Sequence, residues 1–218
     1  MGKGVSFGVG FFLGLAVTAT AVGLAVNGVV PYVDAKIGLA LPHNDSLVSM
    51  PLTDDERGMV NFARGPANVG DVYRWSVSVP ARTASVWGQA YGNGSDLGRV
   101  FELSAPDVAL SNDQPGELLV GFVRDAGLTI PVSLSAGSGT VSSFYEVKAP
   151  FDLSLAMGNG GLVRDFTPAA PGKDLPLVWQ VWSNGSEISS PRLDLLNTDP
   201  VAAVRGYDYA LIIWCQFA

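Results

Sequence analysis

A period of two in the apolar residues constrains the fold of this chain more than any other feature. Between Tyr73 and Val79, apolar side chains alternate with arginine and serine, and Pro80 follows directly. Successive side chains of a β-strand point to opposite faces, so this alternation predicts a strand with one buried face. The same alternation returns over residues 207–217, which predicts a second strongly apolar strand at the end of the sequence.

Further short strands are predicted between stretches rich in glycine, serine and proline. They cover residues 83–91, 100–103, 117–124, 130–134, 141–147, 151–157, 175–182 and 191–196. Asn93-Gly94 predicts a hairpin turn, and so does the run from Gly158 to Gly161. Many short strands with almost no helical period predict a mainly β protein, an antiparallel β-sandwich or jelly roll. A parallel sheet would need crossover helices, and a transmembrane barrel needs longer strands of about 9–11 residues.

The first 33 residues form a separate region. Residues 4–33 carry no charged side chain. A helix that spans a bilayer needs roughly 20 apolar residues, so this segment is long enough. The segment predicts a hydrophobic, transmembrane-like N-terminal helix that spans or inserts into a membrane. A secretory signal cleaved after residues 19–21 is the other interpretation. The side chains predicted to make membrane or assembly contacts are Phe7, Phe11, Phe12, Leu13, Leu15, Val17, Leu24 and Val26.

Two smaller motifs lie within this N-terminal segment. Gly4, Gly8, Gly10 and Gly14 repeat a four-residue spacing that lets helices approach closely in lipid. They are predicted to be helix-packing glycines, and the alternative is that glycine accumulates there without a packing role. The sequence that begins Met1-Gly2 also matches the acceptor pattern for N-myristoylation of Gly2, which requires removal of Met1.

Residues 34–70 are predicted to be a linker to a β-domain that covers residues 71–218. Thr53 and Glu56 have the spacing of a capping box, which predicts a short helix over residues 54–62. The acidic residues there complement the helix N-terminus, with a calcium site as the alternative. His43 is the only histidine, and its turn-like surroundings indicate a solvated loop residue.

Charge and cysteine content exclude several classes of protein. The net charge is -7 and the 13 basic residues are scattered singly, so we predict no strong nucleic-acid binding. Charged residues make up only 15% of the chain, which leaves neutral surface for neighbouring molecules to cover. Cys215 is the only cysteine, so the chain forms no internal disulfide and no zinc site built from histidine and cysteine.

No sequence pattern indicates catalysis. Ser-His-Asp catalysis would depend on His43, and no G-x-S-x-G turn precedes a predicted helix. The glycines at 92, 94 and 98 lack the spacing of a phosphate-binding loop. No pair of carboxylates stands out among the 20 acidic residues. We therefore predict a protein that is not an enzyme, with no catalytic residue, no metal and no cofactor.

The strand pattern of residues 72–217 resembles that of single jelly-roll capsid proteins of icosahedral viruses. The resemblance rests on the strand over residues 116–122, on the charged turn at Arg124-Asp125, and on the final apolar strand. It implies a jelly-roll fold and self-assembly into a shell. Small coat proteins of this kind usually carry a basic N-terminal arm, whereas residues 4–33 are glycine-rich and apolar. This departure is similar to the myristoylated or membrane-penetrating N-termini of some capsid polypeptides.

The leading hypothesis is a structural subunit, a self-assembling capsid or coat protein of a virion with a membrane-interacting N-terminus. Its expected partners are copies of itself, other shell subunits and a lipid membrane. The alternative is a single-pass, membrane-anchored β-sandwich accessory subunit or a pilin-like filament subunit of a cellular complex. An exported carbohydrate-binding or hydrolytic sandwich is the third. Candidate contact aromatics, with a core position as the alternative, are Trp75, Trp87, Trp179, Trp182 and Trp214.

Overall fold

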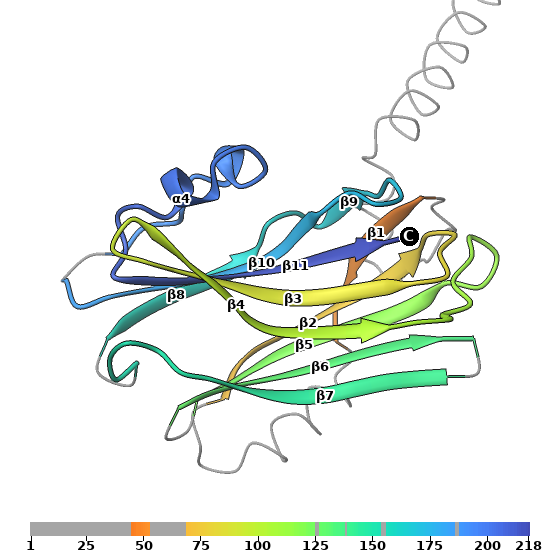
Figure 1. Cartoon of the computed structure of the whole chain (residues 1–218), viewed down its shortest axis with the longest axis horizontal. Coiled ribbons are helices and arrows are strands. Elements are labelled where there is room, and N and C mark those ends of the chain that lie inside the picture. Colours follow the sequence, from red (N-terminus) through yellow and green to blue (C-terminus); the bar gives the residue numbers. More distant parts are fainter. Residues whose placement is uncertain (1–44, 53–68, 125–126, 138, 154–155, 186–187) are drawn as a thin grey trace, which may run out of the picture.

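The described part of the chain forms two antiparallel β-sheets that pack face to face (Figure 1). The structure is a computed structural model, and it describes residues 45–52, 69–124, 127–137, 139–153, 156–185 and 188–218. The predicted mainly β sandwich is thereby confirmed. The predicted helix over residues 4–33, Gly2, His43 and the capping box at Thr53 all lie outside the described residues. Among the described helices, none has the length and apolar content needed to cross a membrane.

Six strands form the first sheet. They are β1 (Ser46–Met50), β2 (Val69–Ser78), β5 (Gly116–Arg124), β6 (Leu128–Ala136), β7 (Gly139–Val147) and β9 (Phe166–Pro168). Their order across the sheet is β7-β6-β5-β2-β1-β9. β1 lies within the stretch predicted to be a linker. Its five residues show no clear alternation of apolar and polar side chains, because two of them are serines and a proline follows directly.

Five strands form the second sheet. They are β3 (Ala84–Gly92), β4 (Ser95–Ala105), β8 (Met157–Leu162), β10 (Leu175–Ser183) and β11 (Tyr209–Phe217). Their order is β4-β3-β11-β10-β8, so β11 lies at the centre of this sheet. The 3-10 helix η1 (Leu193–Leu195) and the short helix α4 (Pro200–Ala203) lie between β10 and β11 in the sequence.

The strand order differs from that of a jelly roll. A jelly roll is built from two Greek keys shared between its sheets, so few strands that follow one another are paired as hairpins. Here five pairings join consecutive strands within one sheet: β1 with β2, β3 with β4, β5 with β6, β6 with β7, and β10 with β11. This order fits the β-sandwich form of the prediction better than its jelly-roll form. The sequence predicts no connectivity, because alternation reveals strands but not their partners.

The main core fills the space between the two sheets. Trp75, Leu118 and Ile130 contribute from the first sheet, and Leu211 and Ile213 from the second, all with no solvent exposure. These residues belong to the alternating positions that the sequence marked as apolar. Each large side chain buried in this way contributes about 1.5–3 kcal/mol of hydrophobic free energy, so the core is the main source of stability.

A second apolar cluster covers the outer face of the second sheet. Trp179, Ile212 and Trp214 on that face pack against a cover that includes Leu196 and Val204, from the segment that carries η1 and α4. Figure 1 shows this segment lying over the second sheet. Asp199 holds the cover in shape, because its carboxylate accepts a hydrogen bond of 2.9 Å from the backbone N–H of Ala202. β10 and β11 are therefore buried on both faces.

Two local predictions were wrong in the region of β8. The glycine-rich run from Gly158 to Gly161 is not a turn but the paired part of β8. The predicted strand over residues 151–157 is absent from its described residues, 151–153 and 156–157, apart from Met157, the first residue of β8. A Cβ atom at Gly160 would overlap the side-chain amide of Gln180, and one at Gly161 would lie 3.3 Å from the Trp179 ring. These glycines permit close packing against β10 rather than a change of chain direction.

The stretch over residues 191–196 is also not a strand. It forms η1 and irregular structure, because Leu193, Leu195 and Leu196 pack onto the outer cluster instead of pairing with a sheet. The five tryptophans, in contrast, are buried in the core, which was the alternative prediction, since none is more than 7% exposed. The prediction that they form contacts with a partner is therefore not supported, because their side chains are covered within the chain itself.

Candidate functional site

The first candidate site is an edge of the first sheet. Edge strands expose unpaired backbone groups, and proteins usually blunt them with short length, proline, bulges or charges. β9 has only three residues and ends in Pro168, and β8 is a glycine-rich strand of six residues. β4 is interrupted twice in its pairing with β3 and carries Asp96, Arg99 and Glu102. Three of the four edges are therefore blunted.

The fourth edge, β7, is long and regularly paired, and Glu146 is its only charged residue. Its nine residues pair with β6 in an unbroken register, and its sequence GTVSSFYEV contains no proline, lysine or arginine. Val141 is 38% exposed and Phe144 is 77% exposed, the largest exposure of any large apolar side chain among the described residues. An exposed, regular and largely uncharged strand of this kind is a template for pairing with another strand.

Phe144 ends a row of apolar residues on the outer face of the first sheet. It is paired with Pro131 on β6, and Pro131 lies next to Gly121 on β5. A Cβ atom at Gly121 would lie 2.8 Å from Pro131 Cγ and 3.7 Å from Cγ2 of Val72 on β2, so all of these residues are neighbours. The row contains no charged group. We call Val72, Gly121, Pro131 and Phe144 the apolar row.

The inner face of β7 closes the sandwich on the same side. The ring of Tyr145 stacks on Phe101 of β4 with 4.7 Å between ring centroids, and its hydroxyl donates a 2.8 Å hydrogen bond to the Glu102 carbonyl. These contacts hold β7 against β4 of the other sheet. The edge is thus held in place before any partner binds, which lowers the entropic cost of association.

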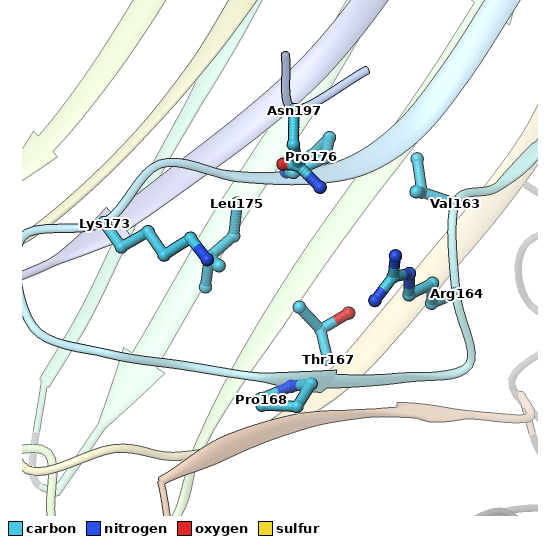
Figure 2. Close-up of a pocket in the computed structure, with 8 residues that line it drawn as sticks. All are labelled: Val163, Arg164, Thr167, Pro168, Lys173, Leu175, Pro176 and Asn197. Atoms are coloured by element: carbon cyan, nitrogen blue, oxygen red, sulfur yellow. The ribbon is translucent and has the colours of Figure 1, made fainter. Parts of the chain in front are cut away.

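The second candidate site is a small cleft of about 130 Å³ beside β9 and β10. Figure 2 shows that the side chains of Arg164 and Lys173 extend into it from opposite sides, with the Thr167 hydroxyl between them. The other lining residues are Val163, Pro168, Leu175, Pro176 and Asn197. The cleft therefore combines apolar walls with two cationic groups, one hydroxyl and one amide.

Neither cation of the cleft forms an ion pair with a described residue. Among the described residues, ion pairs join Arg74 to Glu117, Arg99 to Glu102 and Arg192 to Asp194. The acidic residues next to Arg164 and Lys173 in the sequence accept hydrogen bonds from other side chains. The carboxylate of Asp165 accepts a 3.0 Å hydrogen bond from the Ser49 hydroxyl, and that of Asp174 accepts one of 2.8 Å from the Gln216 amide.

Metal-ligating side chains and buried titratable groups are the other candidates for a site among the described residues. They contain no group of three or more His, Cys, Asp or Glu side chains that could hold a metal ion. Burial raises the pKa of the Cys215 thiol strongly, with a smaller contribution from the charge of Asp174, so this thiol stays protonated and is not a nucleophile at neutral pH. Burial likewise raises the pKa of Tyr91, and the charge of Asp96 adds to the effect.

Tyr209 leads to a prediction for alkaline pH. Burial raises its pKa from 10.0 to about 12, and its hydroxyl has no hydrogen-bond partner among the described residues. Its neutral form is fully present below pH 10, and between pH 10 and 12 only the unfolded chain loses the proton. We expect the free energy of unfolding to fall by about 2–3 kcal/mol across that window because of this group alone.

The Tyr209→Phe variant isolates this contribution, because Tyr91 and Cys215 remain in both proteins. Urea unfolding measured from pH 9 to 11.5 should show a shallower fall in stability for the variant than for the wild type. At pH 7 the variant should be at least as stable as the wild type, since it loses a hydroxyl without a partner. Equal pH dependence in the two proteins would contradict the assignment.

The two candidate sites differ in how visible they are in the sequence. The strand of β7 was predicted, but no pattern indicated that it lies at an edge. Arg164 and Lys173 were passed over as scattered cations, and only the fold brings them to one cleft. The predicted membrane residues and packing glycines lie outside the described residues. Comparison with protein-family models, with curated proteins and with solved structures finds no match to this chain.

Proposed function

We propose that this chain is a non-enzymatic structural subunit that self-associates, with β7 of one copy paired to β7 of a second copy. The observation that carries the proposal is the contrast between β7 and the three blunted edges. An isologous pairing would join the two sheets into one continuous sheet and place the two Phe144 side chains within one interface. The 15% content of charged residues agrees with a chain whose surface is partly covered by its neighbours.

A capsid or coat protein of a virion is the assembly that we propose first. Residues 4–33 then hold the shell on a membrane or enter one, because an uncharged segment of this length favours lipid over water. In such a shell the β-sandwich supplies contacts between copies, and the N-terminal segment supplies contacts with lipid. The partners of the chain are thus further copies, other shell subunits and a membrane.

A membrane-anchored accessory or filament subunit of a cellular complex is the second proposal. The observation that favours it is the strand order, because the hairpin-built sheets differ from the jelly roll expected of a coat protein. Electron microscopy of the purified full chain separates the two proposals. Closed shells support the coat protein, whereas filaments or detergent-dependent complexes support the accessory or filament subunit.

A lysine at position 144 tests self-association through β7. Phe144→Lys removes an apolar side chain from both copies of the interface and places two like charges close together, so we expect the dissociation constant to rise at least about a hundredfold. Size-exclusion chromatography with light scattering of the full chain measures the change. Phe144 is largely exposed, so the variant should fold like the wild type, as circular dichroism can verify.

The matched control is Leu97→Lys on β4. Leu97 is 53% exposed and lies on an edge strand that bulges and charges already blunt. This variant should associate like the wild type. If the Phe144 variant assembles normally, or if both variants dissociate to the same extent, β7 is not the contact surface.

A further inference from the structure

The cleft beside β9 and β10 carries an inference that goes beyond self-association. We propose that it is a binding site for a phosphate-type dianion, held between Arg164 and Lys173. Two cations that approach from opposite sides match a doubly charged oxyanion, and the Thr167 hydroxyl and the Asn197 amide offer further hydrogen bonds. The chain as a whole has a net charge of -7, so two unpaired cations in one cleft are not explained by general surface composition.

The backbone on both sides of the cleft is fixed by hydrogen bonds. Next to Arg164, the Val163 N–H donates to the Leu177 carbonyl at 2.9 Å, and the Asp165 carbonyl accepts from the Ser49 N–H at 2.7 Å. Arg164 therefore starts from a segment that is tied to neighbouring strands. A site with fixed donors loses less entropy when it binds an ion.

The turn that carries Lys173 is tied to β11 in the same way. The Gly172 N–H donates to the Phe217 carbonyl at 2.7 Å, and the Gln216 amide donates to the Gly172 carbonyl at 3.1 Å. Gly172 has a φ of +72°, a conformation that glycine adopts without strain, so the turn is stable as built. Asp165 and Asp174 accept hydrogen bonds from Ser49 and Gln216, and neither forms an ion pair with Arg164 or Lys173.

The size of the cleft limits the ligand. Its volume of about 130 Å³ is smaller than the roughly 300–1,000 Å³ typical of sites for drug-sized molecules. It suits one phosphate group rather than a whole nucleotide. Thr167 is only 7% exposed and Leu175 only 4%, so the floor of the cleft is sheltered while Arg164 and Lys173 remain accessible from solvent. The phosphate could arrive as the free ion or at the end of a larger molecule.

Calorimetric titration of the full chain with inorganic phosphate, at constant ionic strength and pH 7.5, tests the proposal. We expect saturable binding with a dissociation constant on the order of 1 mM, because the two charged contacts lie at a partly exposed site. The double variant Arg164→Gln/Lys173→Gln should bind at least tenfold more weakly. Acetate, which carries one charge, should also bind the wild type at least tenfold more weakly than phosphate.

The control is Arg82→Gln/Arg205→Gln, which makes the same change of net charge at two exposed cations outside the cleft. It should bind phosphate like the wild type. Glycerol phosphate serves as a second ligand: equal binding assigns the site to phosphate groups of larger molecules, and loss of binding assigns it to the free ion. Phosphate binding that does not saturate, an equal loss in the control, or acetate binding as tight as that of phosphate would overturn the proposal.

Discussion

Replacement of Trp75 by alanine is expected to lower the free energy of unfolding by about 3–5 kcal/mol, the largest effect of any single substitution considered for the sandwich. Trp75 lies on β2 near the middle of the first sheet and has no solvent exposure. Its ring lies 6.2 Å from that of Tyr73, and it belongs to the core shared by both sheets. Alanine leaves a cavity there that the paired strands cannot close.

Trp75→Phe is the matched control for this substitution. The indole N–H of Trp75 has no hydrogen-bond partner among the described residues, so phenylalanine removes a buried polar group while it retains most of the apolar volume. We expect a cost below about 1.5 kcal/mol. Urea unfolding followed by circular dichroism measures both variants. A cost of the same size in the two variants would mean that the indole N–H, and not the ring volume, stabilises this part of the core.

A single charge in the N-terminal segment is expected to reduce membrane association about a hundredfold. Arginine near the centre of a membrane-spanning helix costs about 2.5–3.5 kcal/mol, and each 1.4 kcal/mol corresponds to tenfold in an equilibrium constant. Leu15→Arg places that charge inside the uncharged stretch of residues 4–33. Flotation of the full chain with lipid vesicles measures the fraction bound.

Two controls make the membrane test specific. Leu15→Ala keeps the segment uncharged and should bind vesicles almost like the wild type. Deletion of residues 1–33 should abolish binding and leave the circular dichroism of the β-sandwich unchanged. Vesicle binding that persists in the deletion variant would show that the β-domain itself contacts lipid, and the proposed role of the N-terminal segment would then be wrong.

The sequence predicted strands well where one face of the strand is apolar and the other is polar. β2 ends within one residue of its predicted end at Val79, although it begins four residues before Tyr73. Asn93 and Gly94 adopt the positive φ angles, 50° and 74°, of the predicted hairpin turn. These features depend on residues that are close in the sequence. They are therefore visible before any partner strand is known.

The sequence failed where long-range packing overrides local preference. The glycines of β8 favour a turn locally, but close packing against Gln180 holds them in a strand. The leucines around η1 look like a strand, but they cover the outer face of the second sheet. The edge position of β7 and the meeting of Arg164 with Lys173 depend on strand order, which periodicity does not encode.

The central place of β11 has a consequence for how the chain acquires its structure. β11 joins β3 to β10, and every strand of the second sheet that it connects precedes it in the sequence. During synthesis this sheet therefore stays in two separate pieces, each with an open apolar margin, until residues 209–217 have been made. Such an order requires strands that are far apart in the sequence to pair, which is slow. The intermediates expose apolar surface, so they are open to aggregation, chaperones and proteases. A premature stop before Tyr209 would trap the chain in that divided state.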